Sequence, residues 1–430
     1  MKNIGKPCAG KPHARFDEGG QGETCSLLYH FSSKNFQGVP KNMRDTFLPF
    51  STPTIGDAEI SEVVDSLRSG WITTGPKVKR FEEAFRDYVG APYAVALSSA
   101  TAGLHLTLLA LKIQEGDEII TTPMTFASTV SMIILCGGTP VLADIEPGTL
   151  NIDVNEVRKK ITPRTRAIIP VHFAGQSCDM DPLFELASRH GLTIIEDAAH
   201  AAGAEYKGKR IGSLDSVSIF SFHPNKNITT GEGGMVCTPD EQLAEDVALL
   251  KFHGMSREAW KRFSATGAPG YDIMLPGFKY NMMDIQAAIG IHQLPRLDGF
   301  IDRRREIAEF YNRELAGVEE LSIPRLAPYG QRHAWHLYTP LVRIEKLGID
   351  RDGFMAGLKR HNIGSGLHYK AIHHHAWYRE NMPVPDAELP NASYASARIL
   401  SLPLFPMMTD QDAKDVVEAV ISVITQFRRS

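Results

Sequence analysis

Short apolar segments alternate with amphipathic helical segments through the first two thirds of the sequence. "YAVALSS" precedes "AGLHLTLLALKI", "DEIITTP" precedes "TVSMIILCGG", and "TPVLADI" precedes "DVNEVRKKI". Repeated strand–helix units predict a mostly parallel sheet that is covered by helices on both faces. We therefore expect an α/β fold, in which ligands bind outside the carboxyl ends of the strands.

The pattern changes at two places, which predicts three parts. Residues 1–47 precede the first helical pattern, "TIGDAEISEVVDSLRSG", and are expected to form a poorly ordered N-terminal extension. Residues 48–288 carry the alternating pattern and are expected to form the large α/β domain. Residues 289–430 begin with a long charged helix, "LDGFIDRRREIAEFYNREL", and end with "DQDAKDVVEAVISVITQF", which predicts a smaller α+β C-terminal domain.

The charge of the chain argues against nucleic acid or a membrane surface as a partner. The net charge is -4, and no block of Lys and Arg interrupts the sequence. No apolar run reaches the roughly 20 residues that a membrane-spanning helix needs. Small molecules are therefore the expected partners.

The cysteines indicate a reducing compartment. Cys8, Cys25, Cys136, Cys178 and Cys237 are odd in number and include no C-x-x-C pair, so a disulfide framework is not expected. We expect a cytoplasmic protein.

Three strand ends carry polar residues, and each allows two interpretations. "SSATAG" (98–103) would hold a phosphate at a helix N-terminus, or Ser99 or Thr101 would cap the helix. Asp197 in "TIIEDAAHA" needs a cation or donors if it is buried, or it caps the following helix. Neighbouring Glu196 should point to the opposite face of the sheet. Lys226 in "SFHPNKNITTGEGG" is either a surface charge or a Schiff-base nucleophile.

Taken together, the three strand ends offer what pyridoxal phosphate requires. That cofactor needs an anchor for its phosphate, a carboxylate for its pyridine nitrogen and a lysine for an imine bond. The sequence contains neither G-x-x-x-x-G-K-[ST] nor G-x-G-x-x-G, which argues against nucleotide hydrolysis and a standard dinucleotide fold.

An ordered set of motifs from about Leu48 to the C-terminus resembles the DegT/DnrJ/EryC/StrS-type sugar aminotransferases, which are fold-type I pyridoxal phosphate enzymes. The motifs are "SGWITTGPK", "SSATAG", "AIIPVHFAG", "IEDAAHA", "IFSFHPNKNITTGEGG", "LKFHGM", "KYNMMDIQAAI", "AWHLY" and "SLPLFP". Some relatives of this family have His in place of the lysine and perform dehydration. This chain has Lys226, which favours transamination.

The resemblance implies a role for each matching position. Lys226 forms the covalent aldimine with pyridoxal 5'-phosphate, and Asp197 contacts the pyridine nitrogen. The remaining cofactor-binding positions are Thr101, Ala102 and Ser221 at the phosphate, Phe126 stacked on the ring, His200 near the ring substituents, and Asn281, which reaches the cofactor of the other subunit. A homodimer with shared active sites follows from the last of these roles.

The resemblance also implies the reaction. L-glutamate donates the amino group and leaves as 2-oxoglutarate, and a nucleotide-linked 4-keto sugar accepts it. "SGWITTGPK" and "GLHYK" favour a UDP-4-keto-pentose, which would give UDP-4-amino-4-deoxy-L-arabinose for lipid A or cell-envelope modification. The alternatives are a UDP-4-keto-6-deoxy-N-acetylhexosamine or a dTDP-4-keto-6-deoxy sugar. A non-catalytic cofactor-bound sensor is the alternative of another class.

Further residues are candidates for substrate contacts or for metal binding. His368 and Lys370 of "GLHYK" are expected in the substrate pocket, and Lys251 is a further candidate contact. The run His373 to His375 suggests a metal, but adjacent histidines are expected to diverge and no Cys or paired carboxylate accompanies them. We therefore expect no metal site.

Overall fold

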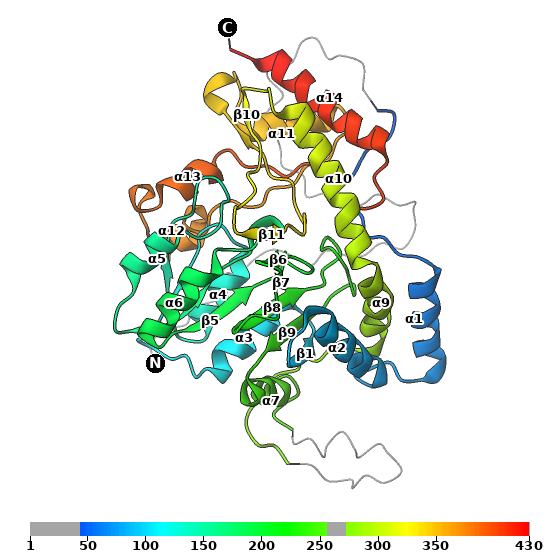
Figure 1. The fold of residues 1–430 in the computed structure, drawn as a ribbon, viewed down its shortest axis with the longest axis vertical. Coiled ribbons are helices and arrows are strands. Elements are labelled where there is room, and N and C mark those ends of the chain that lie inside the picture. Colours follow the sequence, from blue (N-terminus) through cyan, green and yellow to red (C-terminus); the bar gives the residue numbers. More distant parts are fainter. Residues whose placement is uncertain (1–43, 256–271, 430) are drawn as a thin grey trace, which may run out of the picture. The chain divides into compact units, whose positions relative to one another are not determined.

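A seven-stranded sheet forms the centre of the molecule (Figure 1). The computed structural model describes residues 44–255 and 272–429. The strand order is β1-β9-β8-β5-β4-β2-β3, and only β9 runs antiparallel to its neighbours. The strands are β1 Tyr93–Leu97, β2 Glu118–Thr121, β3 Thr139–Leu142, β4 Thr165–Ile169, β5 Thr193–Asp197, β8 Val217–Ser221 and β9 Gly234–Thr238.

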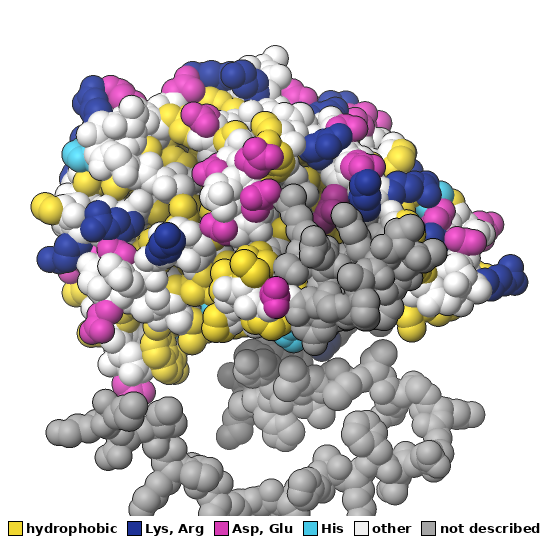
Figure 2. Space-filling model, turned by 90° about the horizontal axis from the view of Figure 1, so that it is seen from below, with side chains coloured by type: hydrophobic (Ala, Val, Ile, Leu, Met, Phe, Trp, Pro, Cys, Tyr) yellow, Lys and Arg dark blue, Asp and Glu magenta, His cyan; other side chains and the backbone are white. Residues whose placement is uncertain are grey.

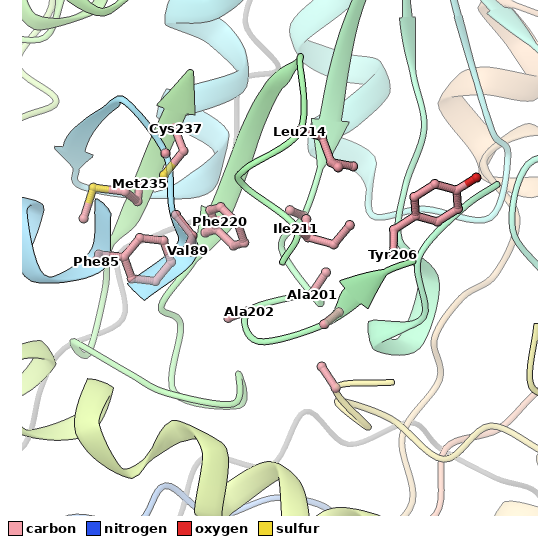
Figure 3. Packing of buried hydrophobic residues seen from close by; sticks show 14 of the residues in the cluster. Phe85, Val89, Ala201, Ala202, Tyr206, Ile211, Leu214, Phe220, Met235 and Cys237 are labelled. Carbon is pink, nitrogen blue, oxygen red and sulfur yellow. The ribbon is translucent and has the colours of Figure 1, made fainter. Parts of the chain in front are cut away.

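Helices cover both faces of this sheet, as the alternating pattern predicted. One buried cluster packs α2, α5, α6 and α9 against one face, and a second packs α3, α4 and α7 against the other. Successive strand residues serve opposite faces, so Phe220 belongs to the first cluster and Ile219 to the second. Figure 3 shows Phe85, Phe220 and Met235 gathered in the first cluster. The helices are α1 Asp57–Ser69, α2 Pro76–Val89, α3 Ala100–Ala110, α4 Ala127–Leu135, α5 Val154–Lys160, α6 Met180–His190, α7 Glu241–Leu250 and α9 Asp284–Gln293.

The C-terminal third contains the two helices that the sequence predicted. Both the long charged helix and the closing helix are confirmed, as α10 Leu297–Leu315 and α14 Asp410–Phe427, and they pack with α11 around a further apolar cluster. The other elements are β6 Glu205–Tyr206, β7 Lys209–Arg210, β10 Leu321–Ser322, β11 Gly330–Arg332, β12 Leu341–Val342, α11 Arg351–Arg360, α12 Ala376–Asn381 and α13 Pro390–Ser396, with 3-10 turns η1 Phe173–Gly175, η2 Leu294–Arg296, η3 Ile344–Lys346, η4 Ile372–His374 and η5 Asp386–Glu388.

The predicted division of the chain at residue 288 falls inside α9 and stays a prediction. Most of the predicted extension, residues 1–43, lies outside the described residues. Of its described part, Arg44 forms an ion pair with Asp412 at 2.7 Å, at the start of α14.

Local capping explains where several helices begin and end. α1 ends before Gly70, whose φ of 74° is a left-handed conformation that glycine adopts without steric cost. α3 begins after Ser99, whose hydroxyl oxygen accepts a hydrogen bond from the backbone N–H of Ala102 at 3.1 Å. The cap directs the first turn of α3 to the carboxyl end of β1.

The charge of the surface and the apolar length of the helices are relevant to the partners that the sequence predicts. Figure 2 shows Lys and Arg side chains interspersed with Asp and Glu on the visible face. Within residues 44–255 and 272–429, none of the helices has the length and apolar content that crossing a membrane requires.

A buried polar pair lies on the face of β5 opposite Asp197. The Glu196 carboxylate accepts hydrogen bonds from His172 Nε2 at 2.6 Å, from Ser218 Oγ at 2.8 Å and from the Ser216 hydroxyl. Cys178 N–H donates to His172 Nδ1 at 3.0 Å, which places the ring proton on Nε2. Burial alone would raise the pKa of Glu196, but these hydrogen bonds lower it below its usual value. Glu196 therefore anchors β5 through buried hydrogen bonds and does not pair with Asp197.

Replacing Glu196 with Ala should destabilise the protein by about 3 kcal/mol, because it leaves three buried donors without an acceptor. A thermal melt of the whole chain should show a fall of several degrees. Because the folded pKa of Glu196 is lowered, its contribution is present above the unfolded pKa and is lost as the pH falls. Glu185→Ala, at an exposed pair on α6, is the control and should change little. Equal melting temperatures for both variants would contradict this assignment.

Candidate active site

One cavity lies at the carboxyl ends of β1, β5 and β8. Its volume is about 550 Å³. Because β1, β5 and β8 point the same way, the residues that follow them meet at one edge of the sheet. The predicted site residues that line it are Thr101, Phe126, Asp197, His200, Ser221, Lys226, His368 and Lys370.

Lys226 lies in the loop after β8, and its side chain is half-buried at the wall of the cavity. Its backbone N–H donates to His223 O at 2.9 Å, and the side-chain amide of Asn227 donates to Ala334 O at 2.6 Å, so the loop is held on both sides. Burial lowers the pKa of Lys226 to about 8, and the charge of Asp197 opposes part of that shift. The amine is therefore a better nucleophile at neutral pH than an exposed lysine.

Asp197 ends β5 and is buried, and donors satisfy both of its carboxylate oxygens. Thr129 Oγ1 donates to Oδ2 at 2.7 Å, and the backbone N–H of Ala199 donates to Oδ1 at 3.2 Å. Thr125 Oγ1 lies 2.7 Å from Thr129 Oγ1. Since the Thr129 proton is used on Asp197, Thr125 donates to Thr129, and two buried hydroxyls form a chain that ends on the carboxylate.

The sequence did not single out these two threonines. Thr125 precedes α4 and Thr129 lies in its first turn, and only the fold brings their hydroxyls together at Asp197.

His200 is buried beside Asp197 and bonded to a tyrosine that the sequence interpretation also missed. Ala174 N–H donates to His200 Nδ1 at 3.3 Å, so Nε2 carries the hydrogen and donates to the Tyr369 hydroxyl at 2.9 Å. Burial, and then the charge of Lys226, hold the pKa of His200 well below its usual value. His200 is therefore neutral. The ring of Phe126, which is 61% exposed, lies across the cavity with its centroid 6.3 Å from that of Tyr369.

The start of α3 and the end of β8 form the proposed phosphate end of the cavity. Thr101 and Ser221 both line it. The backbone N–H of Ala102 is already donated to Ser99, and Ala102 is not among the lining residues. Gly234 packs against the same turn, where a Cβ would lie 2.4 Å from Ser99 C, so only glycine fits there.

Besides Ala102, the structure places two predicted residues, Lys251 and Asn281, outside this lining. The Lys251 ammonium donates to Glu82 Oε1 and to Ala96 O, both at 3.1 Å. Asn281 donates from Nδ2 to Thr74 Oγ1 at 2.6 Å. A contact of Asn281 with the other subunit's cofactor, and of Lys251 with substrate, stay predictions.

The substrate candidates His368 and Lys370 both line the cavity. His368 Nδ1 is 2.9 Å from Ser401 Oγ, and its ring stacks on Phe50 with centroids 5.2 Å apart. Burial, and then the charge of Lys226, lower the pKa of His368 to about 4. Lys370 is exposed at the cavity rim.

A lysine and a buried carboxylate in one cavity at the carboxyl edge of a mostly parallel sheet fit the class of pyridoxal phosphate-dependent enzymes. The profile of the DegT/DnrJ/EryC1/StrS aminotransferase family matches residues 53–421, and the chain belongs to that family. The predicted fold class and the family resemblance are therefore confirmed.

Relatives in sequence and in structure agree with the family assignment. The spore coat polysaccharide biosynthesis protein SpsC of Bacillus subtilis is 48% identical over 382 residues, covering 89% of this chain and 98% of its own. Spr1654 of Streptococcus pneumoniae is 34% identical, with a TM-score of 0.81 over 88% of this chain and 99% of its own. PseC of Helicobacter pylori, an aminotransferase involved in the biosynthesis of pseudoaminic acid, is 30% identical, with a TM-score of 0.81 over 89% of this chain and 100% of its own.

Pyridoxal phosphate is the cofactor, and the residues around the cavity fit it. The family is pyridoxal phosphate-dependent, and Spr1654 has been solved in PLP and PMP forms. In this chain the fit is seen in Lys226, whose lowered pKa suits an imine-forming amine, and in Asp197, whose carboxylate faces the cavity. The N-terminus of α3 supplies a place for the phosphate.

The pH dependence of Lys226 follows from its burial. Its pKa of about 8 means that the neutral amine fraction rises with pH through a midpoint at about pH 8, whereas an exposed lysine titrates near 10.4. The rate at which the cofactor-free protein forms an imine with pyridoxal phosphate should follow this curve in stopped-flow absorbance. A midpoint near 10 would show that burial does not lower the pKa. Lys226→Arg should give no imine.

Replacing Thr129 with Val should weaken pyridoxal phosphate binding about tenfold, because the Asp197 carboxylate loses the hydrogen bond that orients it. Equilibrium dialysis of the cofactor-free protein measures this. Thr129→Ser should keep the affinity. Thr107→Val in α3 is a matched control, since its buried hydroxyl has no hydrogen-bond partner in the part of the chain that the structure describes. Unchanged affinity in Thr129→Val would contradict the role of Thr129.

Proposed function

We propose that the chain moves an amino group from L-glutamate to a nucleotide-linked 4-keto sugar, with Lys226 and Asp197 as its catalytic residues. The observation that carries the proposal is that both face one cavity, with the Lys226 pKa lowered to about 8 and the Asp197 carboxylate held by two donors. A sugar aminotransferase of this family requires this arrangement.

Each catalytic side chain has a task that follows from its surroundings. Lys226 would bind the cofactor through Nζ and, as the free amine, would move a proton to and from the substrate carbon. Asp197 would hold the pyridine nitrogen and keep it protonated. Neutral His200 and Tyr369 line the cavity and are hydrogen-bonded to each other. When bound, pyridoxal phosphate supplies the electrophilic carbon and an electron-accepting ring.

We propose a UDP-4-keto-pentose as the acceptor, which would yield UDP-4-amino-4-deoxy-L-arabinose for cell-envelope modification. The support is the resemblance of "SGWITTGPK" and "GLHYK" to the pentose-type enzymes of the family. "GLHYK" contributes His368, Tyr369 and Lys370 to the cavity. Lys370, at the rim, is proposed to contact the phosphates of the nucleotide or the donor carboxylate.

The relatives leave room for another acceptor. PseC is involved in the biosynthesis of pseudoaminic acid, and SpsC in that of a spore coat polysaccharide. The alternative acceptors are therefore a UDP-4-keto-6-deoxy-N-acetylhexosamine and a dTDP-4-keto-6-deoxy sugar.

We also propose a cytoplasmic homodimer with shared active sites. Asp284 N–H donates to Thr73 O at 2.9 Å, which joins the start of α9 to the "SGWITTGPK" segment. Trp71, Ile72 and Met283 on these two segments are 44%, 49% and 42% exposed. An apolar surface beside Asn281 supports a second copy there. The free cysteines Cys136, Cys178 and Cys237 support a reducing compartment.

Two half-reactions test this function. With L-glutamate the pyridoxal form should convert to the pyridoxamine form, which absorbance detects, and the Lys226→Arg protein should not convert. The pyridoxamine form is then mixed with a panel of nucleotide keto sugars, of which the UDP-4-keto-pentose should restore the pyridoxal form fastest.

Each other result has a stated meaning. A faster reaction with the 6-deoxy-N-acetylhexosamine substrate would replace the acceptor. Reaction with simple keto acids alone would contradict a sugar acceptor. A cofactor-bound protein that does not react with glutamate would favour the sensor alternative.

A further inference from the structure

His373, His374 and Asp386 converge on one another outside the active-site cavity. His374 Nε2 lies 2.9 Å and His373 Nε2 3.5 Å from Asp386 Oδ1. These three ligand atoms all lie within 4.8 Å of one another. The expectation that adjacent histidines diverge does not hold here, because η4 curls the chain and brings the two ring centroids to 4.1 Å.

Two serines of α13 contact this cluster, Ser396 at the outer ring nitrogen of His374 and Ser393 at the atoms that converge. Ser396 Oγ lies 2.9 Å from His374 Nδ1 and also accepts the N–H of Ala371 at 2.9 Å. Ser393 Oγ lies 2.9 Å from His373 Nε2 and 3.2 Å from Asp386 Oδ1. The orientation of His374 is therefore fixed through its other ring nitrogen, as in histidines that bind metals.

We propose that this cluster binds a divalent first-row transition-metal ion of the zinc type. The ligands are the Nε2 atoms of His373 and His374 and the Oδ1 atom of Asp386, with water in a fourth position. Ser393 Oγ, which contacts two of these atoms, must turn away to admit the ion. Imidazole and carboxylate ligands suit zinc, and atoms around a tetrahedral zinc ion lie roughly 3.4 Å apart. The two separations from Asp386 Oδ1 bracket this value, and the 71% exposed Asp386 side chain is free to adjust.

The number of ligands and an unpaired ring nitrogen limit the affinity of the cluster for zinc. Three ligands are fewer than in closed structural zinc sites. In addition, the buried His373 Nδ1 has no hydrogen-bond partner within the described parts of the chain, and its hydrogen would stay unpaired in the metal-bound tautomer. We expect a dissociation constant on the order of 10⁻⁶ M, weaker than that of four-ligand sites.

The position of the cluster gives the ion a structural effect. The same segment contributes His368, Tyr369, Lys370 and His375 to the active-site cavity, and His375 Nε2 lies 3.1 Å from Lys370 O. An ion on His373 and His374 would tie this cavity wall to Asp386, in the connection that leads to α13. Metal binding should therefore stabilise the wall without taking part in amino transfer.

The test uses the full chain without a polyhistidine tag, stripped with a chelator. Zn²⁺ is titrated in competition with a chromophoric chelator, and Co²⁺ is added separately to follow its visible ligand-field absorption. The wild-type protein should bind one Zn²⁺ per chain, show a tetrahedral Co²⁺ spectrum and melt at a higher temperature with Zn²⁺.

Two variants decide the outcome. Asp386→Asn removes an exposed ligand and should fold, but its Zn²⁺ affinity should fall at least about tenfold and its melting temperature should not respond to Zn²⁺. Asp65→Asn, at a side chain that is 69% exposed in an ion pair of α1, is the matched control and should behave as the wild type. Equal Zn²⁺ binding by Asp386→Asn and the wild type, or no binding by the wild type, would overturn the proposal. The result does not depend on the acceptor sugar.

Discussion

The structure depends on placing the carboxylate of Asp197 at the buried carboxyl end of β5. An ionised carboxylate at this depth is costly unless donors and a cation meet it. Thr129, the backbone of Ala199 and the nearby Lys226 meet that requirement. Each of these partners comes from a different segment. Their interactions with the carboxylate therefore bring α4, the loop after β5 and the loop after β8 together at one cavity.

The sheet topology makes this convergence possible. The carboxyl ends of the parallel strands lie at one edge of the sheet. The single antiparallel strand of this sheet, β9, lies between β1 and β8 and places the backbone of Gly234 against the first turn of α3. On the other face of β5, Glu196 and His172 form a satisfied buried pair. One strand therefore carries a structural carboxylate and a chemical carboxylate at adjacent positions, separated by the alternation of side chains.

Local patterns were enough to predict the fold class and to single out Asp197 and Lys226 as candidates. Strand–helix alternation predicted the sheet, and polar residues after apolar strands indicated Asp197 and Lys226, which both line one cavity. Their catalytic roles stay predictions. The long helices α10 and α14 followed from their periodicity. These features depend on neighbours in sequence, so a single sequence contains the information.

Features that depend on distant contacts could not be predicted in this way. Thr129 reaches Asp197 across 68 residues of sequence, and Tyr369 reaches His200 across 169. Lys251 has the residue type of a substrate contact, but its partners Glu82 and Ala96 come from α2 and β1. The convergence of His373 and His374 required both a 3-10 turn and an aspartate from the next connection. In each case the partner is determined by packing.

Lys226 is the amine proposed to bind the cofactor, in the same cavity as Asp197. The most direct measurement is borohydride reduction of the cofactor-loaded protein, followed by proteolysis and mass spectrometry of the labelled peptide. We expect a single phosphopyridoxyl label on Lys226. A label on another lysine, or a labelled Lys226→Arg protein, would contradict it.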